Sequence, residues 1–244
     1  MGQFFAKDYT GTPFVFLGPP HLAVIVILLL VNVSLVRMRD KPRARKAFRY
    51  GLATVLLVNE LAWHVWNAAV GQWTLQTMLP LHLCSLLVWT TAAMLFTQNY
   101  PIYEFIYFMG IGGALQAVLT PDLGIYGFPH FRFFQTFISH GSIITAAVFM
   151  TVVEGLRPYW RSILRVFIAM NIYMVVVFGI NILLGSNYLF IMRPPDTPSL
   201  IDALGPWPWY LLSLQAIGLA TCLVLYLPFA LKDWRTARRV QAAA

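Results

Sequence analysis

The sequence predicts an all-α membrane protein, a polytopic helical bundle of about seven transmembrane helices that forms a single domain over residues 1–244. Three observations lead to this prediction. Apolar residues make up 59% of the chain and charged residues only 11%, whereas soluble domains carry about 25% charged residues. Seven apolar segments are long enough to cross a hydrocarbon core of about 30 Å. Lysine and arginine also gather in alternate connections between these segments, a bias that orients membrane proteins.

Each predicted span has its own signals. The first is an apolar run, and the stretch before it lacks the basic start and the cleavage site of a signal peptide. The second follows a basic stretch. The third, fourth and seventh begin near Pro80, Pro101 and Pro208, because a first-turn proline loses no helical hydrogen bond. The fifth and sixth flank a second basic connection. The predicted spans are 20–37, 50–70, 79–97, 101–119, 133–153, 162–184 and 207–231.

The placement of charge predicts the orientation. Fourteen of the 17 Lys and Arg residues lie in segments 37–49, 157–165 and 232–239, which alternate along the chain. The other three are Lys7, Arg132 and Arg193. The positive-inside rule then puts the amino terminus outside and the carboxyl terminus in the cytoplasm. The net charge of +8 is thereby explained by topology and lipid headgroups, and we expect no nucleic-acid partner.

The outer loops are rich in proline, glycine, aspartate and aromatic residues. Structured loops of this kind predict a rim or a lid. For Trp207, Trp209 and Tyr210 the alternative is an interfacial aromatic belt. The two cysteines, Cys84 and Cys222, are too few for a disulfide framework, and we expect both thiols to be free.

Polar residues within the predicted spans indicate a site, since unpaired polar groups in lipid cost several kcal/mol. Glu60, His64 and Asn67 share one face of the second helix because they are spaced by four and three. The other polar residues of interest are His82, Cys84, Ser85, Gln116, His140, Asn181 and Asn187. Cys84, His64 and His140 lie about 7–11 Å below the outer helix ends at 1.5 Å per residue. A pocket in the outer half of the membrane would produce this distribution.

A structural interpretation stands beside each of these assignments. Glu60 and His64 form an i,i+4 pair that would neutralise two buried groups. The asparagines and Gln116 are typical of hydrogen bonds between membrane helices. Cys222 is typical of a small apolar filler.

Cys84 is the candidate nucleophile. It lies near the start of the third helix, where the helix dipole favours a thiolate. His82 is about 200° around the helix from Cys84 and is poorly placed as its base. We therefore expect the base on another helix, with His140 as the first candidate and His64 as the second.

Three histidines at one level, His64, His82 and His140, could also bind zinc. No zinc-binding motif supports that interpretation, so we expect neither a metal nor another cofactor.

The run Leu79-Pro-Leu-His82-Leu-Cys84-Ser85, together with Thr120-Pro-Asp122, Ser139-His-Gly141 and Ser186-Asn-Tyr188, resembles the bacterial YwaF-like integral membrane proteins. These in turn look like relatives of an animal multispan family implicated in acyl transfer to ether phospholipids. The resemblance implies that Cys84 accepts the acyl group, with His140 as its partner. It extends over nearly the whole chain from the second helix onward.

We therefore predict a multi-pass cell-membrane enzyme acting on a membrane phospholipid or lysophospholipid, either an acyltransferase (transacylase) or an acyl hydrolase. Glu60, His64, His82 and Ser85 would orient or tune the Cys84–His140 pair. Substrate contacts would come from Asn67, Gln116, Asn181, Asn187 and Tyr188. The alternative is a carrier or receptor that binds a lipid or small molecule without catalysis. A retinal protein is excluded, because Lys7, Lys41, Lys46 and Lys232 all lie outside the spans. The oligomeric state stays open.

Overall fold

The computed structural model describes residues 2–196 and 199–243, and the regular elements in this part of the chain are all helical. The chain divides into two compact units. Unit 1 comprises the residues up to Thr74 together with Leu83–Leu156, and unit 2 comprises Leu75–His82 and Arg157–Ala244. Each unit is described by itself.

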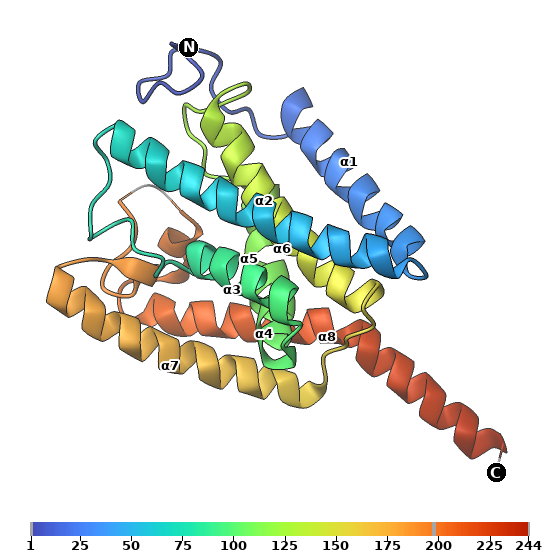
Figure 1. The fold of residues 1–244 in the computed structure, drawn as a ribbon. Coiled ribbons are helices and arrows are strands. Elements are labelled where there is room, and N and C mark those ends of the chain that lie inside the picture. The colour runs from blue at the N-terminus through green and yellow to red at the C-terminus, as the bar shows by residue number, and fades with distance from the viewer. Residues whose placement is uncertain (1, 197–198, 244) are drawn as a thin grey trace. The chain divides into compact units, whose positions relative to one another are not determined.

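Unit 1 is built around helix α6, Phe131–Val152, whose side chains are mostly buried. Helices α1, α2, α3 and α5 all pack against it (Figure 1). The elements of unit 1 are α1 (Pro19–Ser34), η1 (Leu35–Met38), α2 (Pro42–Ala69), α3 (Leu83–Thr97), α4 (Tyr100–Phe105), η2 (Ile106–Gly110), α5 (Ile111–Leu119) and α6. Because α2 and α3 also pack against each other, unit 1 brings together α2, α3 and α6. These are three of the helices that carry the polar residues identified in the sequence.

Unit 2 pairs two long helices, α7 (Trp160–Leu184) and α8 (Trp209–Ala243), with the short turns η3 (Tyr188–Phe190) and η4 (Leu200–Leu204). Helix α7 ends at Gly185, whose φ of 63° is left-handed, a conformation that glycine adopts without strain. The chain then folds back on α7, and Val177, Tyr188 and Ile191 form a buried apolar cluster there.

Five helical segments of the described chain are long and apolar enough to cross a membrane. They are Pro19–Met38, Tyr100–Leu119, Phe131–Val152, Trp160–Leu184 and Trp209–Gln241, and they correspond to the first, fourth, fifth, sixth and seventh predicted spans. The fourth is one continuous helix with a π-helical turn, η2, at its centre. Pro101 lies in its first turn, as expected.

The second and third predicted spans differ from the helices observed. Helix α2 begins at Pro42, so the basic residues Arg43, Arg45, Lys46 and Arg49 lie on the helix and not in a loop. Helix α3 begins at Leu83 and has 15 residues, about 22 Å at 1.5 Å per residue. The predicted span 79–97 was therefore too long at its start, because Pro80 precedes the helix. The count of seven spans and the orientation stay predictions.

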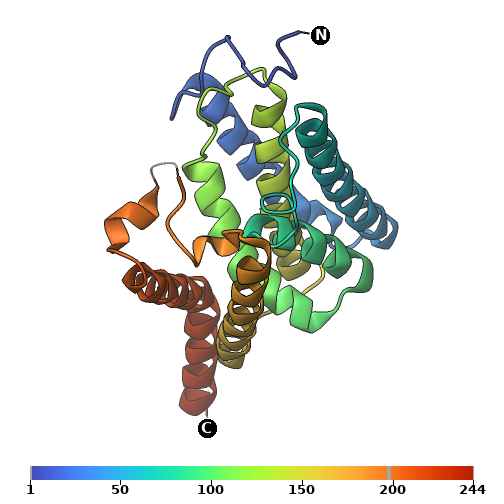
Figure 2. The ribbon, with the colours of Figure 1, turned by 90° about the vertical axis from the view of Figure 1, so that its left-hand side faces the viewer.

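The amino-terminal segment before α1 lies over the ends of α2 and α6 (Figures 1 and 2). The Trp66 indole N–H donates to the Phe5 carbonyl over 2.9 Å, and the Tyr126 hydroxyl donates to the Lys7 carbonyl over 2.9 Å. His130 bonds to the Ala6 carbonyl over 3.0 Å. These bonds make the segment a cap over one end of unit 1.

Candidate functional site

Glu60 is the centre of a polar cluster in unit 1. It lies on α2 and is only 3% exposed. Ser85 on α3 interacts with its carboxylate. His64, one turn further along α2, places Nε2 3.7 Å from Glu60 Oε1. The cluster therefore joins α2 to the first turn of α3.

His64 is oriented by a residue that sequence reasoning missed. The Trp73 indole N–H donates to His64 Nδ1 over 3.0 Å. A ring that accepts at Nδ1 and is neutral carries its proton on Nε2, the nitrogen that faces Glu60. The i,i+4 spacing of Glu60 and His64 was visible in the sequence, but the loop that brings Trp73 back to α2 was not.

Cys84 is the second residue of α3, an exposed residue whose thiol forms no disulfide. Cys84 therefore lies about 1.5 Å along the helix axis from the first residue of α3. The sequence had predicted a depth of about 7 Å below the outer end of the helix. The Glu60 carboxylate lies within electrostatic range of the thiol.

His140 lies on α6, and α3 and α6 pack against each other. Its Nδ1 bonds to the Thr136 carbonyl over 2.8 Å, one turn earlier on the same helix. Nδ1 therefore carries the proton and Nε2 holds the free lone pair. That Nε2 atom is buried and has no hydrogen-bond partner among the described residues. A buried, unpaired acceptor of this kind is suited to taking a proton from a nucleophile or a ligand.

His82, the other predicted supporting histidine, belongs to unit 2. Its ring packs against those of Tyr188 and Phe190, with centroids 5.0 and 5.1 Å away. The Leu189 N–H donates to its Nδ1 over 3.4 Å. Within unit 2 the ring therefore packs on the turn η3.

The predicted substrate contacts in unit 2 shape the segment after α7. Asn181 donates to the Tyr188 carbonyl over 3.0 Å and accepts from the Tyr188 N–H over 2.8 Å. Asn187 donates to the Arg193 carbonyl over 2.9 Å. The Tyr188 hydroxyl donates to the Leu75 carbonyl over 2.7 Å and accepts from the Leu79 N–H over 2.9 Å. These bonds favour a structural role, and contact with a lipid stays a prediction.

The two remaining predicted contacts lie in unit 1. The Asn67 amide donates to the Trp63 carbonyl over 2.8 Å, one turn earlier on α2. Gln116 is exposed on α5. Neither residue joins the cluster around Glu60 through a described bond.

In the sequence, Arg132 served only to predict the orientation of the chain in the membrane. In the structure it lies where α2 packs against α6. The Arg132 guanidinium lies 3.8 Å from the ring centroid of Trp63 and donates to the Gln135 side chain. Asn59 links the same helices by donating to the Gln135 carbonyl over 3.0 Å.

Among the described residues, no three His, Cys, Asp or Glu side chains are grouped as metal ligands would be.

The chain was compared with protein families, with curated proteins and with solved structures. The model of the TMEM164 family matches residues 14–226. No curated protein and no solved structure matched.

Proposed function

Because the chain belongs to the TMEM164 family, a family of multispan membrane proteins, we propose that it is a membrane-embedded lipid acyl-transfer or acyl-hydrolysing enzyme. Cys84 is the nucleophile and His140 is its general base. This match agrees with the sequence resemblance, which leads to an animal multispan family. The matched region also contains every residue of the cluster around Glu60.

One observation carries the proposal. A free cysteine, exposed as a residue, lies at the start of α3 in the same unit as a histidine whose Nε2 is buried and has no hydrogen-bond partner among the described residues. A histidine with its Nδ1–H held by a backbone carbonyl is pre-oriented to accept a proton at Nε2. In the reacting complex the thiol sulfur and Nε2 must approach to hydrogen-bond reach, about 3 Å.

The reaction runs in two halves. His140 Nε2 removes the Cys84 proton, and the sulfur attacks the carbonyl carbon of a lipid ester. The tetrahedral intermediate collapses to a thioester on Cys84, and the departing alkoxide takes the proton from His140. In the second half, the hydroxyl of a lysophospholipid, or water, loses its proton to His140 and attacks the thioester carbonyl. The carbon–sulfur bond then breaks, and the departing Cys84 thiolate takes the proton back from His140.

The surrounding groups have distinct parts in this reaction. The N–H groups in the first turn of α3 have no partner within the helix, so they are the donors for the oxyanion. Ser85, which interacts with Glu60, positions the carboxylate. Glu60 in turn faces the Nε2–H of the neutral His64 ring, 3.7 Å away. The substrate is a phospholipid, and the acyl acceptor decides between transfer and hydrolysis.

The test is trapping of the acyl-enzyme. Purified protein in liposomes is given phospholipid with a radiolabelled acyl chain, and hydroxylamine-sensitive label on the protein is measured. Wild type and Cys222→Ala, the matched control, should be labelled, whereas Cys84→Ala should not. His140→Gln should slow labelling by roughly 10²- to 10⁴-fold, the usual contribution of a general base.

Folding of each variant is checked by its thermal unfolding midpoint in detergent. Full turnover by a folded Cys84→Ala protein on every lipid tested would exclude the thiol mechanism. Saturable lipid binding by the wild type without label or turnover would instead support the carrier or receptor alternative.

A further inference from the structure

Unit 1 contains a buried arginine far along α2 from the cluster around Glu60. Arg49 lies on α2 and is 9% exposed. Its Nε and Nη1 atoms are buried and have no hydrogen-bond partner among the residues that the structure describes. A buried guanidinium with unused donors is costly, and it is therefore a candidate anion-binding group.

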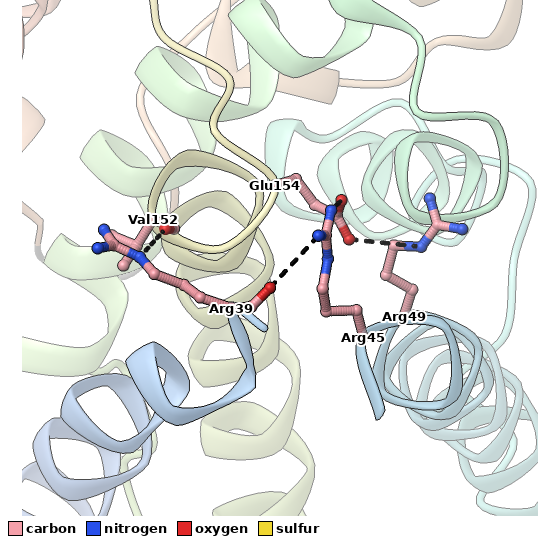
Figure 3. A network of polar contacts seen from close by, with 5 residues as sticks. All are labelled: Arg39, Arg45, Arg49, Val152 and Glu154. Carbon is pink, nitrogen blue, oxygen red and sulfur yellow. Dashed lines mark hydrogen bonds and ion pairs between the residues drawn. The ribbon is translucent and has the colours of Figure 1, made fainter. Parts of the chain in front are cut away.

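The neighbours of Arg49 form a small network that is richer in cations than in anions (Figure 3). Glu154, just after α6, forms an ion pair with Arg45 and lies 4.0 Å from Arg49 Nε. Arg39 Nε donates to the Val152 carbonyl over 2.8 Å, and Arg45 Nη1 donates to the Arg39 carbonyl over 3.4 Å. Two guanidinium groups, those of Arg45 and Arg49, thus share the Glu154 carboxylate, and Arg39 adds a third cation to the network.

We propose that Arg49, together with Arg45, binds the phosphate group of an anionic ligand. A guanidinium presents N–H donors in a planar fork that matches the oxygens of a phosphate. The Glu154 carboxylate engages Arg45 and lies beside Arg49 when no phosphate is bound, and the incoming phosphate competes with it. This site is independent of the chemistry proposed for Cys84.

The position of Arg49 favours a lipid as the source of the phosphate. Arg43, Arg45, Lys46 and Arg49 occupy the first two turns of α2, and the apolar part of the helix follows. Basic residues at such a boundary lie at the level of the lipid headgroups. An anionic phospholipid is therefore the expected class of ligand, with phosphatidylglycerol as the probe, and free phosphate presents the same chemistry from solution.

The experiment uses the full chain purified in detergent micelles. Binding is measured from the shift of the unfolding midpoint on titration with phosphatidylglycerol, with diacylglycerol of the same chains as the phosphate-free control. A parallel titration uses inorganic phosphate against chloride at equal ionic strength. Arg43→Gln is the matched variant, because Arg43 is exposed on the same helix and the substitution removes the same charge.

Arg49→Gln should bind phosphatidylglycerol roughly tenfold to a hundredfold more weakly, the range of charge-assisted hydrogen bonds, while Arg43→Gln should change binding by less than about twofold. Glu154→Gln keeps the shape of the side chain but removes the competing charge, so it should bind more tightly. Saturation by inorganic phosphate alone would support the phosphate site with a soluble source.

Equal losses in Arg43→Gln and Arg49→Gln would show that only the general surface charge matters, and the site would be overturned. The Glu154→Gln variant provides a second criterion if Arg49→Gln does not fold. Unchanged or weaker binding by folded Glu154→Gln would also overturn the site.

Discussion

His130 connects two parts of unit 1 through a single neutral ring. Its Nδ1 accepts from the Arg132 N–H over 3.1 Å and so caps helix α6, while Nε2 donates to the Ala6 carbonyl. The ring is fully buried and stacks on Tyr126 with centroids 4.6 Å apart. Both bonds are possible together only for the neutral tautomer with its proton on Nε2.

This geometry predicts a pH dependence for the amino-terminal cap. Burial is the main cause that lowers the pKa of His130 below its ordinary value, and Arg132 lowers it further. Because the folded pKa lies below the unfolded one, the stability from this ring is complete above about pH 6.5. It is lost as the pH falls toward the folded pKa. Hydrogen exchange of residues 2–18, corrected for intrinsic rates, should therefore increase on acidification.

His130→Asn is the control for that measurement, because asparagine also caps a helix but does not titrate in this range. Exchange in this variant should be nearly independent of pH once corrected. The same acid-induced increase in both proteins would contradict the role assigned to His130.

At the scale of elements, the cap over unit 1 depends on a close approach of two backbones. The Phe14 N–H donates to the Gly124 carbonyl over 3.1 Å. At the buried residue Gly127, an added Cβ would lie 2.6 Å from the Pro13 carbonyl oxygen. Backbone atoms cannot shift as a flexible side chain can, so only glycine fits at this position.

Two glycine-to-alanine substitutions should therefore act in opposite directions. Gly127→Ala should destabilise the protein by about 1–3 kcal/mol, the usual cost of overpacking. Gly51→Ala on α2 meets open space and should stabilise it by up to about 1 kcal/mol, because alanine is the better helix former. Unfolding midpoints in detergent would compare them. A Gly127→Ala midpoint at or above that of the wild type would contradict the close approach.

At the scale of the whole molecule, the charge asymmetry predicts on which side of the membrane each loop lies. In a background lacking Cys84 and Cys222, single cysteines would be introduced as Asp122→Cys and Gln241→Cys, at two exposed positions. A membrane-impermeant maleimide should label Asp122→Cys in intact cells, and Gln241→Cys only after the cells are lysed. The reverse pattern would contradict an external amino terminus and a cytoplasmic carboxyl terminus.

The sequence alone predicted much of the helical framework, because length and hydrophobicity are properties of continuous segments. Four of the predicted spans coincide closely with apolar helices, and the seventh begins close to its predicted start but its helix continues to Gln241. The start of α3 was placed too early, since Pro80 was read as a first-turn residue although the helix begins at Leu83. Short polar stretches at helix ends carry little periodic signal, so such boundaries depend on packing.

The side-chain partners were decided by the tertiary structure. Helical spacing put Glu60 and His64 on one face of α2, but the interaction of Ser85 with Glu60 and the hydrogen bond from Trp73 to His64 join separate segments. The pairing of Arg45 with Glu154 spans more than a hundred residues. A sequence determines the faces of each helix through its period, whereas the rotation of one helix against another is set by packing. Only the folded chain therefore decided which polar groups meet, and which, like His140 Nε2 and Arg49, have unused hydrogen-bonding capacity.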